Sequence, residues 1–119
     1  AEPWCAHMVA TIYREQGTPL PGDIAPTLRQ HNPIARVQTM WERLVEAGWQ
    51  VESPRTGDVI IFNSRAGSDT GAGWHVGIVS AVSSDGEIVQ TIEGNSGDAV
   101  ARRSYGVSHH RIVGFARPL

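Results

Sequence analysis

Residues 74–93 read WHVGIVSAVSSDGEIVQTIE, and this stretch decides the fold. It contains two runs, Trp74–Val82 and Glu87–Glu93, in which β-branched residues are frequent, as is typical of β-strands. Between the runs, Ser84-Asp85-Gly86 is a turn signal, because aspartate and glycine adopt the backbone conformations that a tight hairpin requires. The stretch therefore predicts an antiparallel hairpin.

The hairpin brings the first and last polar residues of this stretch, His75 and Glu93, to one edge of the sheet. His75 lies about ten residues before the turn and Glu93 about seven after it, so their positions differ by roughly one residue pair. A histidine hydrogen-bonded to a carboxylate is held in one tautomer and becomes a better base. The two residues therefore indicate an acid–base pair, with a solvated or purely structural pair as the alternative.

Three further strands are expected after residue 56. Gly57–Phe62 is continuously apolar from Val59 onward, which is typical of a central strand covered on both faces. Ala99–Tyr105 and Arg111–Ala116 follow the hairpin. Together with the hairpin they predict one antiparallel sheet of five to six strands.

The first half of the chain predicts helices. One begins at Pro3 and ends before Gly17, and the second runs from Pro33 to Ala47 before Gly48. The second helix has one expected apolar stripe, consisting of Ile34, Val37, Met40, Trp41, Leu44 and Val45. Helices followed by strands predict an α+β fold, with the N-terminal helices packed on the antiparallel sheet.

The first helix carries the single cysteine of the chain, Cys5, in its first turn. Unpaired N–H groups and the positive end of the helix dipole at this position favour the thiolate and lower the pKa of a cysteine. Most lone cysteines are buried apolar residues, so packing is the alternative. Together with His75 and Glu93, however, Cys5 indicates nucleophilic catalysis.

Composition narrows the class of protein. A chain of 119 residues with 40% hydrophobic residues predicts one domain, residues 1–119, with one core. No apolar run approaches the length of a membrane span. The net charge of −2 argues against nucleic acid or an anionic membrane as the main partner, and one cysteine excludes an internal disulfide. No signal peptide is recognisable, and the start close to Cys5 is consistent with a mature fragment or an excised domain.

Four motifs in this order resemble the CHAP family, the cysteine/histidine-dependent amidohydrolases/peptidases within the papain-like group. The motifs are Trp4-Cys5-Ala6, Gly57–Phe62, Trp74–Val79 and Ile92-Glu93-Gly94-Asn95. The resemblance implies a papain-like fold with Cys5 as nucleophile, His75 as general base, Glu93 as the orienting acid and Asn95 as a fourth polar residue of the site. An acidic calcium-binding loop that some members carry before the cysteine is absent, so no metal and no other cofactor is expected.

The resemblance also implies a function. We expect a peptidoglycan hydrolase, as in a phage endolysin or bacterial autolysin, that cleaves the stem peptide or cross-bridge as an endopeptidase or N-acetylmuramoyl-L-alanine amidase. Trp4 and Trp74 are expected to border the substrate groove, with a packing role as the alternative. The expected partner is bacterial peptidoglycan, the expected location is extracellular or in the cell wall, and the expected state is a monomer.

Two other classes remain open from the sequence. One is another papain-like cysteine enzyme, either an NlpC-like endopeptidase or an injected antibacterial amidase effector. A glutamate as third residue with an asparagine nearby favours CHAP over this class. The other is a non-catalytic module that binds the wall, and the joint presence of cysteine, histidine, glutamate and asparagine argues against it.

Overall fold

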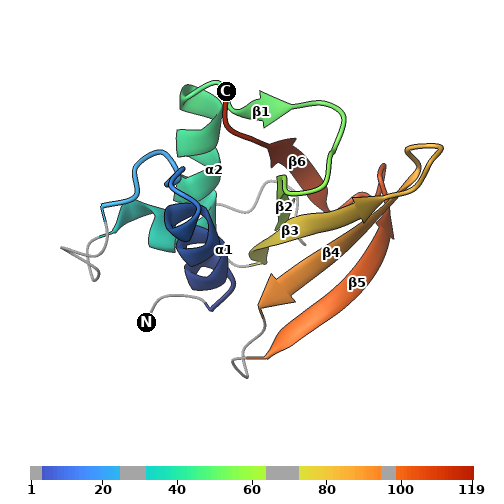
Figure 1. The fold of residues 1–119 in the computed structure, drawn as a ribbon, viewed down its shortest axis with the longest axis horizontal. Helices are drawn as coiled ribbons and strands as arrows, with labels where there is room; N and C mark the ends of the chain where they lie inside the picture. The colour runs from blue at the N-terminus through green and yellow to red at the C-terminus, as the bar shows by residue number, and fades with distance from the viewer. Residues whose placement is uncertain (1–3, 25–31, 64–72, 95–98) are drawn as a thin grey trace.

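The computed structural model describes residues 4–24, 32–63, 73–94 and 99–119 (Figure 1). In chain order its elements are α1 (Trp4–Glu15), the 3₁₀-helix η2 (Pro33–Ala35), α2 (Val37–Glu46), β1 (Gln50–Val51), β2 (Val59–Asn63), β3 (Trp74–Val82), β4 (Ile88–Gly94), β5 (Val100–Gly106) and β6 (Ile112–Ala116). The strands form one antiparallel sheet in the order β1-β6-β2-β3-β4-β5. The expected α+β fold is confirmed.

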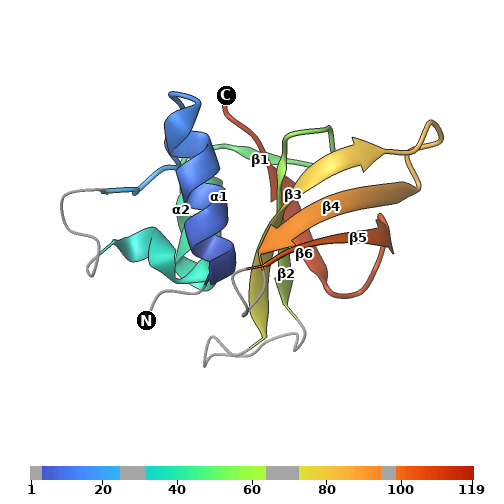
Figure 2. The same ribbon diagram turned by 60° about the horizontal axis from the view of Figure 1, so that its bottom comes forward.

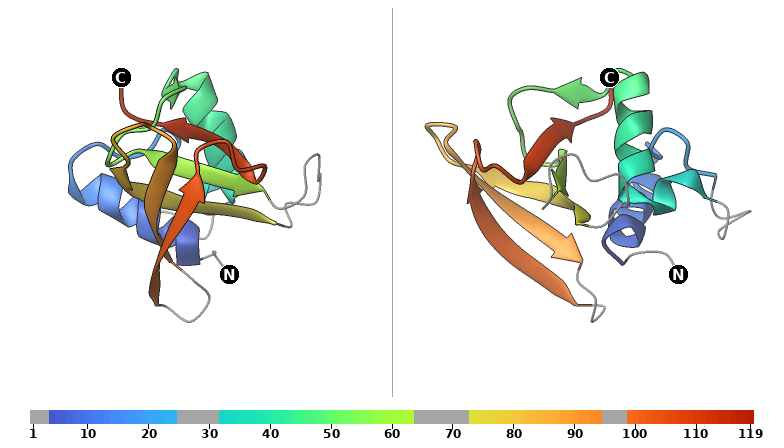
Figure 3. Two further views of the ribbon diagram at one scale, coloured as in Figure 1. Left: turned by 90° about the vertical axis from the view of Figure 1, so that its right-hand side faces the viewer. Right: turned by 180° about the vertical axis from the view of Figure 1, so that it is seen from behind.

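The molecule has a helical layer on one face of a strongly curved sheet. Figure 2 shows α1 and α2 side by side, with β3, β4 and β5 on the other side of α1. Seen from behind, β4 and β5 bend away from the helices (Figure 3, right). None of the helices in the described ranges is long and apolar enough to cross a membrane.

Strand β2 is buried on both faces, as its continuous apolarity predicts. Val59 and Ile61 face the helices and join a core with α1 and α2. Ile60 and Phe62 point to the opposite face, into a second core. The curvature of the sheet closes this second core, because the ring of Phe62 on β2 lies 4.9 Å from the ring of Tyr105 on β5, which is three places away in the sheet.

The prediction that the second helix starts at Pro33 is wrong. Asn32 caps η2, its side chain accepting a hydrogen bond from the N–H of Ile34, and Arg36 then has an extended backbone with φ −96° and ψ 126°. The extended Arg36 separates η2 from α2, so Pro33–Ala47 is two elements.

The predicted apolar stripe is also one residue too wide. Val37, Met40 and Leu44 are buried at helical spacing, whereas Val45 is 43% exposed because it lies a further 100° around the helix. Trp41 lies at the side of the stripe and packs over Gly114 of β6. A Cβ atom at Gly114 would come within 2.6 Å of the Trp41 ring. The close approach of α2 to the sheet therefore depends on this glycine.

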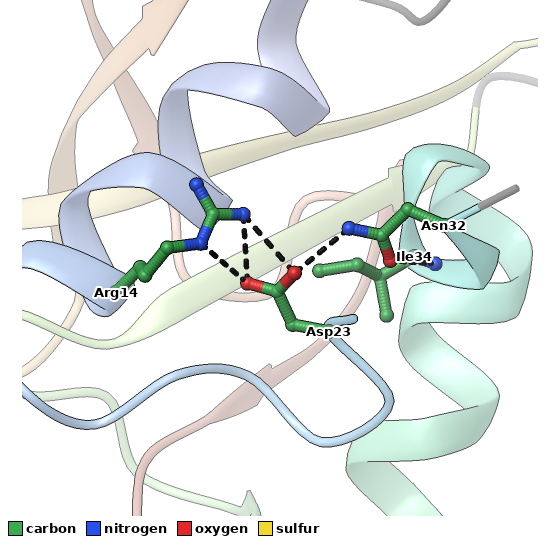
Figure 4. A network of polar contacts seen from close by, with 4 residues as sticks. All are labelled: Arg14, Asp23, Asn32 and Ile34. Atoms are coloured by element: carbon green, nitrogen blue, oxygen red, sulfur yellow. Dashed lines mark hydrogen bonds and ion pairs between the residues drawn. The ribbon is translucent and has the colours of Figure 1, made fainter. Parts of the chain in front are cut away.

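The buried carboxylate of Asp23 connects segments of the helical layer through hydrogen bonds (Figure 4). Arg14 of α1 donates hydrogen bonds of 2.8 and 3.2 Å to its Oδ2 and of 3.0 Å to its Oδ1. Asn32, the cap of η2, donates to Oδ1 at 2.7 Å. Three separate segments are thus joined by charge-assisted hydrogen bonds, which are stronger than neutral ones.

A second buried carboxylate, Asp58, lies directly before β2. Arg117, after β6, donates to both of its oxygens at 2.9 and 3.1 Å, and the backbone N–H of Arg55 donates at 2.7 Å. Nearby, the hydroxyl of Tyr13 on α1 donates to the carbonyl of Gly57. These contacts connect α1, the start of β2 and the C-terminal segment.

Candidate active site

The predicted hairpin positions His75 and Glu93. Its turn has Gly86 at φ +76°, and the Asp85 side chain accepts hydrogen bonds from the Ser83 hydroxyl and the Glu87 N–H. A register shift between Val79 and Ala81 then leaves Ile78 opposite Ile92. Glu93 is consequently diagonal to His75 on the same face, and the two side chains meet.

The contact between them is short and largely buried. His75 Nε2 lies 2.8 Å from Glu93 Oε1, with the Glu93 side chain 4% exposed and the His75 side chain 27% exposed. The residue opposite Glu93 is Gly77. A Cβ atom there would approach Glu93 Cγ to 2.8 Å and the Ile92 carbonyl to 3.0 Å. The glycine of Trp74-His75-Val76-Gly77 therefore makes room for the carboxylate that orients the histidine.

The second oxygen of Glu93 has its own donors. Its Oε2 accepts hydrogen bonds from Thr91 Oγ1 at 2.5 Å and from Tyr105 Oη at 2.8 Å. Arg103 Nε lies 3.7 Å from Oε1. The carboxylate is thus fixed from β4 and β5, so it presents one defined oxygen to the imidazole.

Cys5 approaches His75 from α1. The helix contacts β3 and β4, and Figure 2 shows its first turn beside the end of β4. The thiol is buried, and the His75 side chain lies near enough to lower its pKa. Because Nε2 of His75 faces Glu93, Nδ1 is the nitrogen left for Cys5. His75 therefore contacts the carboxylate of Glu93 and interacts electrostatically with the thiol of Cys5.

This arrangement favours a thiolate–imidazolium pair. Burial raises the pKa of the Cys5 thiol, but the hydrogen bond and charge of His75, with the backbone groups of Val76 and Ala6, outweigh burial and lower the pKa. Burial lowers the pKa of His75, and its hydrogen bonds to Cys5 and Glu93 reverse this and raise the pKa to about 9. Both shifts stabilise the charged forms.

The orienting carboxylate is charged as well. Burial raises the pKa of Glu93, while hydrogen bonds from His75, Thr91 and Tyr105 lower it below its ordinary value. Burial, together with the hydrogen bond to Glu93, raises the pKa of Tyr105 to about 12, so the Tyr105 hydroxyl remains a donor. Glu93 therefore acts as an acceptor toward all three partners.

A groove borders the His75–Glu93 pair. It has a volume of about 680 Å³, and His75 and Glu93 form part of its wall. The rest of its described lining comes mainly from β5 and from Arg111, just before β6. The imidazole thus contacts Glu93 and also borders an open cavity.

The sequence of the first 95 residues matches a known family. The family model described as the CHAP domain covers residues 1–95, which is most of the chain. The chain belongs to the CHAP family. A comparison with curated proteins finds no match. The match includes Cys5, His75 and Glu93, whereas β5 and β6 lie beyond it.

A solved structure shares the fold of this CHAP domain. An N-acetylmuramoyl-L-alanine amidase from Staphylococcus aureus is similar with a TM-score of 0.55 and 19% sequence identity. The alignment covers 92% of this chain and 30% of the amidase chain. At this identity the likeness establishes the fold.

The other predicted site residues have different outcomes. Asn95 and the side chain of Trp4 lie outside the described residues. Trp74 is half-buried and packs against the core under the helices, and within the described ranges its buried Nε1 has no hydrogen-bond partner. This agrees with the packing alternative for Trp74, and a contact with substrate stays a prediction.

Sequence reasoning missed the residues that hold the carboxylate of the CHAP site. Thr91 lies two positions before Glu93, so strand alternation places it on the same face. Tyr105 comes from β5, and nothing local in the sequence indicates its contact with Glu93. Within the described ranges, no group of three or more His, Cys, Asp or Glu side chains is arranged to hold a metal ion.

Proposed function

We propose that this CHAP domain hydrolyses amide bonds of bacterial peptidoglycan with Cys5 as the nucleophile. The single observation that carries the proposal is the 2.8 Å contact of His75 with Glu93 near the buried Cys5, with the thiol pKa lowered and the imidazole pKa raised. Membership of the CHAP family supports it. The named activity of the staphylococcal amidase is consistent with an amide substrate.

The acylation step follows from the positions of these groups. The Cys5 thiolate attacks the carbonyl carbon of the amide and forms a tetrahedral intermediate. N–H groups in the first turn of α1 have no partner within the helix and lie beside Cys5, so they are suited to stabilise the oxyanion. The His75 imidazolium donates its proton to the leaving amine, the C–N bond breaks, and a thioester remains on Cys5.

Deacylation reverses the roles. Neutral His75 accepts a proton from water as the water attacks the thioester carbonyl, and Cys5 leaves as thiolate, which restores the starting ion pair. Glu93 does not take the proton. It keeps the ring in the orientation that directs one nitrogen to Cys5, and it stabilises the imidazolium.

Digestion of purified cell walls tests the proposal. The wild-type domain is expected to release muropeptides, and mass spectrometry assigns the cut to the muramoyl–alanine bond or to a bond within or between peptides. Cys5→Ala and Cys5→Ser are expected to lose at least about a thousandfold in rate with an unchanged melting temperature. Wall lysis by Cys5→Ala, or wall binding by the wild type without any released product, would contradict the cysteine mechanism.

If the proposal holds, the domain acts at the cell wall, from outside the cell or after release to it. The same digestion separates the remaining classes. A preference for one bond across walls of different cross-bridge chemistry identifies an endopeptidase or an amidase. Pure binding would identify a non-catalytic module.

A further inference from the structure

The groove beside the His75–Glu93 pair is rich in arginine. Three arginines line it: Arg102 and Arg103 on β5, and Arg111 just before β6. All three lie beyond residues 1–95, the part that the family model matches. From Ala99 to Leu119 the sequence contains four arginines and no aspartate or glutamate, in a chain whose net charge is −2. Positive charge is therefore concentrated at this wall of the groove.

The carboxylate that lines the groove forms an ion pair with only one of these arginines, Arg103. Both oxygens of Glu93 are occupied by His75, Thr91 and Tyr105, and Arg103 reaches it only at 3.7 Å. Arg111 is half-buried, and its Nε is buried with no hydrogen-bond partner among the described residues. Among the described residues, Arg102 and Arg111 form no ion pair. The unpaired guanidinium groups at this wall are therefore suited to an anionic ligand.

We propose that this groove binds a free carboxylate of the peptide substrate, next to the amide that Cys5 attacks. The inference rests on the proposed function and names its substrate class. A guanidinium group presents paired N–H donors that match the two oxygens of a carboxylate. Wall stem peptides carry such a group where a glutamate is joined through its side-chain carboxyl and keeps its α-carboxylate free. Amidation of that carboxylate removes the charge and leaves the rest of the peptide unchanged.

The position of the groove favours a carboxylate on the substrate itself over a separate anionic polymer. His75 belongs to its wall, and the scissile amide has to lie within reach of both Cys5 and His75. An anion bound in the groove therefore lies beside the residue that protonates the leaving amine. A phosphate polymer of the wall would bind without this constraint, and the test distinguishes the two.

The test compares one muropeptide in its free-carboxylate and amidated forms. Binding is measured by calorimetry with the Cys5→Ala variant, which separates recognition from cleavage, and kcat/KM is measured with intact Cys5. The free-carboxylate form is expected to bind about tenfold more tightly or better. Arg111→Gln and Arg102→Gln are each expected to reduce this preference, and together to bring the two forms within about twofold.

The matched control is Arg55→Gln, which removes the same charge from an exposed position. Arg55 precedes the start of β2, whereas His75 pairs with Phe62 near the other end of that strand. The backbone N–H of Arg55 donates a hydrogen bond to Asp58, and the substitution keeps this N–H. The preference for the free carboxylate is expected to be unchanged in this variant. Arg102 is exposed, so Arg102→Gln remains informative even if Arg111→Gln fails to fold.

The outcomes separate this inference from the proposed function. Equal binding and equal cleavage of the two forms would overturn the carboxylate site and leave the hydrolase intact. Preferred binding of the free form without cleavage of any wall would keep the site and overturn the hydrolase. Tighter, arginine-dependent binding of a glycerol phosphate polymer than of the acidic muropeptide would overturn the assignment to a peptide carboxylate.

Discussion

Glu93 and Asp58 are both buried carboxylates with several donors, yet their partners differ in kind. Asp58 is paired with Arg117, a cation that does not titrate in the physiological range, and this pair ties the C-terminal segment to β2. Glu93 is paired with His75, whose charge depends on pH and whose second nitrogen is directed to a thiol. The first arrangement can only hold elements together, whereas the second can transfer a proton.

The two sites also differ in what lies beyond the pair. Arg117 also donates a hydrogen bond to a backbone acceptor, the carbonyl of Ser53. His75 is 27% exposed and borders a groove of about 680 Å³. Burial of a carboxylate is thus shared by a structural site and a candidate catalytic site, and the titratable partner beside an open cavity distinguishes the second.

The largest difference is expected when each carboxylate is replaced by its amide. Glu93→Gln should lower kcat/KM for wall peptides by roughly ten- to a thousandfold, about 1.4–4 kcal/mol, because the imidazole loses its orienting charge. The variant should remain folded with a moderately lower melting temperature, because the amide keeps the shape of the side chain but loses the charge that accepts from His75, Thr91 and Tyr105. Kinetics and thermal melting of the same preparation measure both effects, and wild-type activity in Glu93→Ala would remove Glu93 from the site.

The matched change, Asp58→Asn, should have the opposite profile. The free energy of unfolding is expected to fall by about 1.5–3 kcal/mol, because Arg117 loses a charged acceptor. The kcat/KM of the folded fraction should remain within about twofold of wild type. Denaturant unfolding and kinetics below the melting temperature test this. A large kinetic loss in a fully folded Asp58→Asn protein would mean that the two sites are coupled.

The pH dependence of activity should follow the titratable pair alone. His75 carries its proton below its raised pKa of about 9, and Cys5 is thiolate above its lowered pKa. Activity should therefore be highest between these values and fall about tenfold per pH unit above about pH 9, as the imidazolium proton is lost. A profile of kcat/KM against pH, in buffers of constant ionic strength, measures this alkaline limb. Glu93→Gln should move the alkaline limb to lower pH. An alkaline limb that stays in place in Glu93→Gln would argue against His75 as its source.

The smallest effects are expected at the donors to Glu93. Tyr105→Phe and Thr91→Val each remove one hydrogen bond to Oε2, worth about 1 kcal/mol, so each should lower kcat/KM by about two- to tenfold. Tyr105→Phe keeps the ring that packs on Phe62, which makes it the cleaner variant. A shift of the alkaline limb together with the kinetic loss would show that Tyr105 acts through Glu93. A fall in melting temperature with unchanged kcat/KM would make it structural.

Local signals account for the parts of the fold that sequence could predict. The turn at Ser84-Asp85-Gly86 and the alternation around it determine which face His75 and Glu93 share, so their contact follows from the hairpin. The two glycine stops, Gly17 and Gly48, each lie two residues beyond the last residue of a helix and have the positive φ that ends a helix.

The features that were missed depend on contacts across the molecule. Strand β1 has only two residues, Gln50 and Val51, and exists because β6 pairs with it. The break at Arg36 has no glycine or proline to mark it. The contact of Tyr105 with Glu93 requires the register between β4 and β5, which a single sequence does not specify.

The central claim is that His75 and Cys5 form an ion pair, and the single cysteine permits a direct measurement. The rate of Cys5 alkylation by iodoacetamide as a function of pH gives the pKa of this thiol alone. In the wild type this pKa should lie below the value of an unperturbed thiol, about 8.5. In His75→Ala it should rise, because only the smaller effects of the Val76 and Ala6 backbone groups then oppose burial. An apparent pKa at or above about 8.5 in the wild type, unchanged in His75→Ala, would contradict the ion pair.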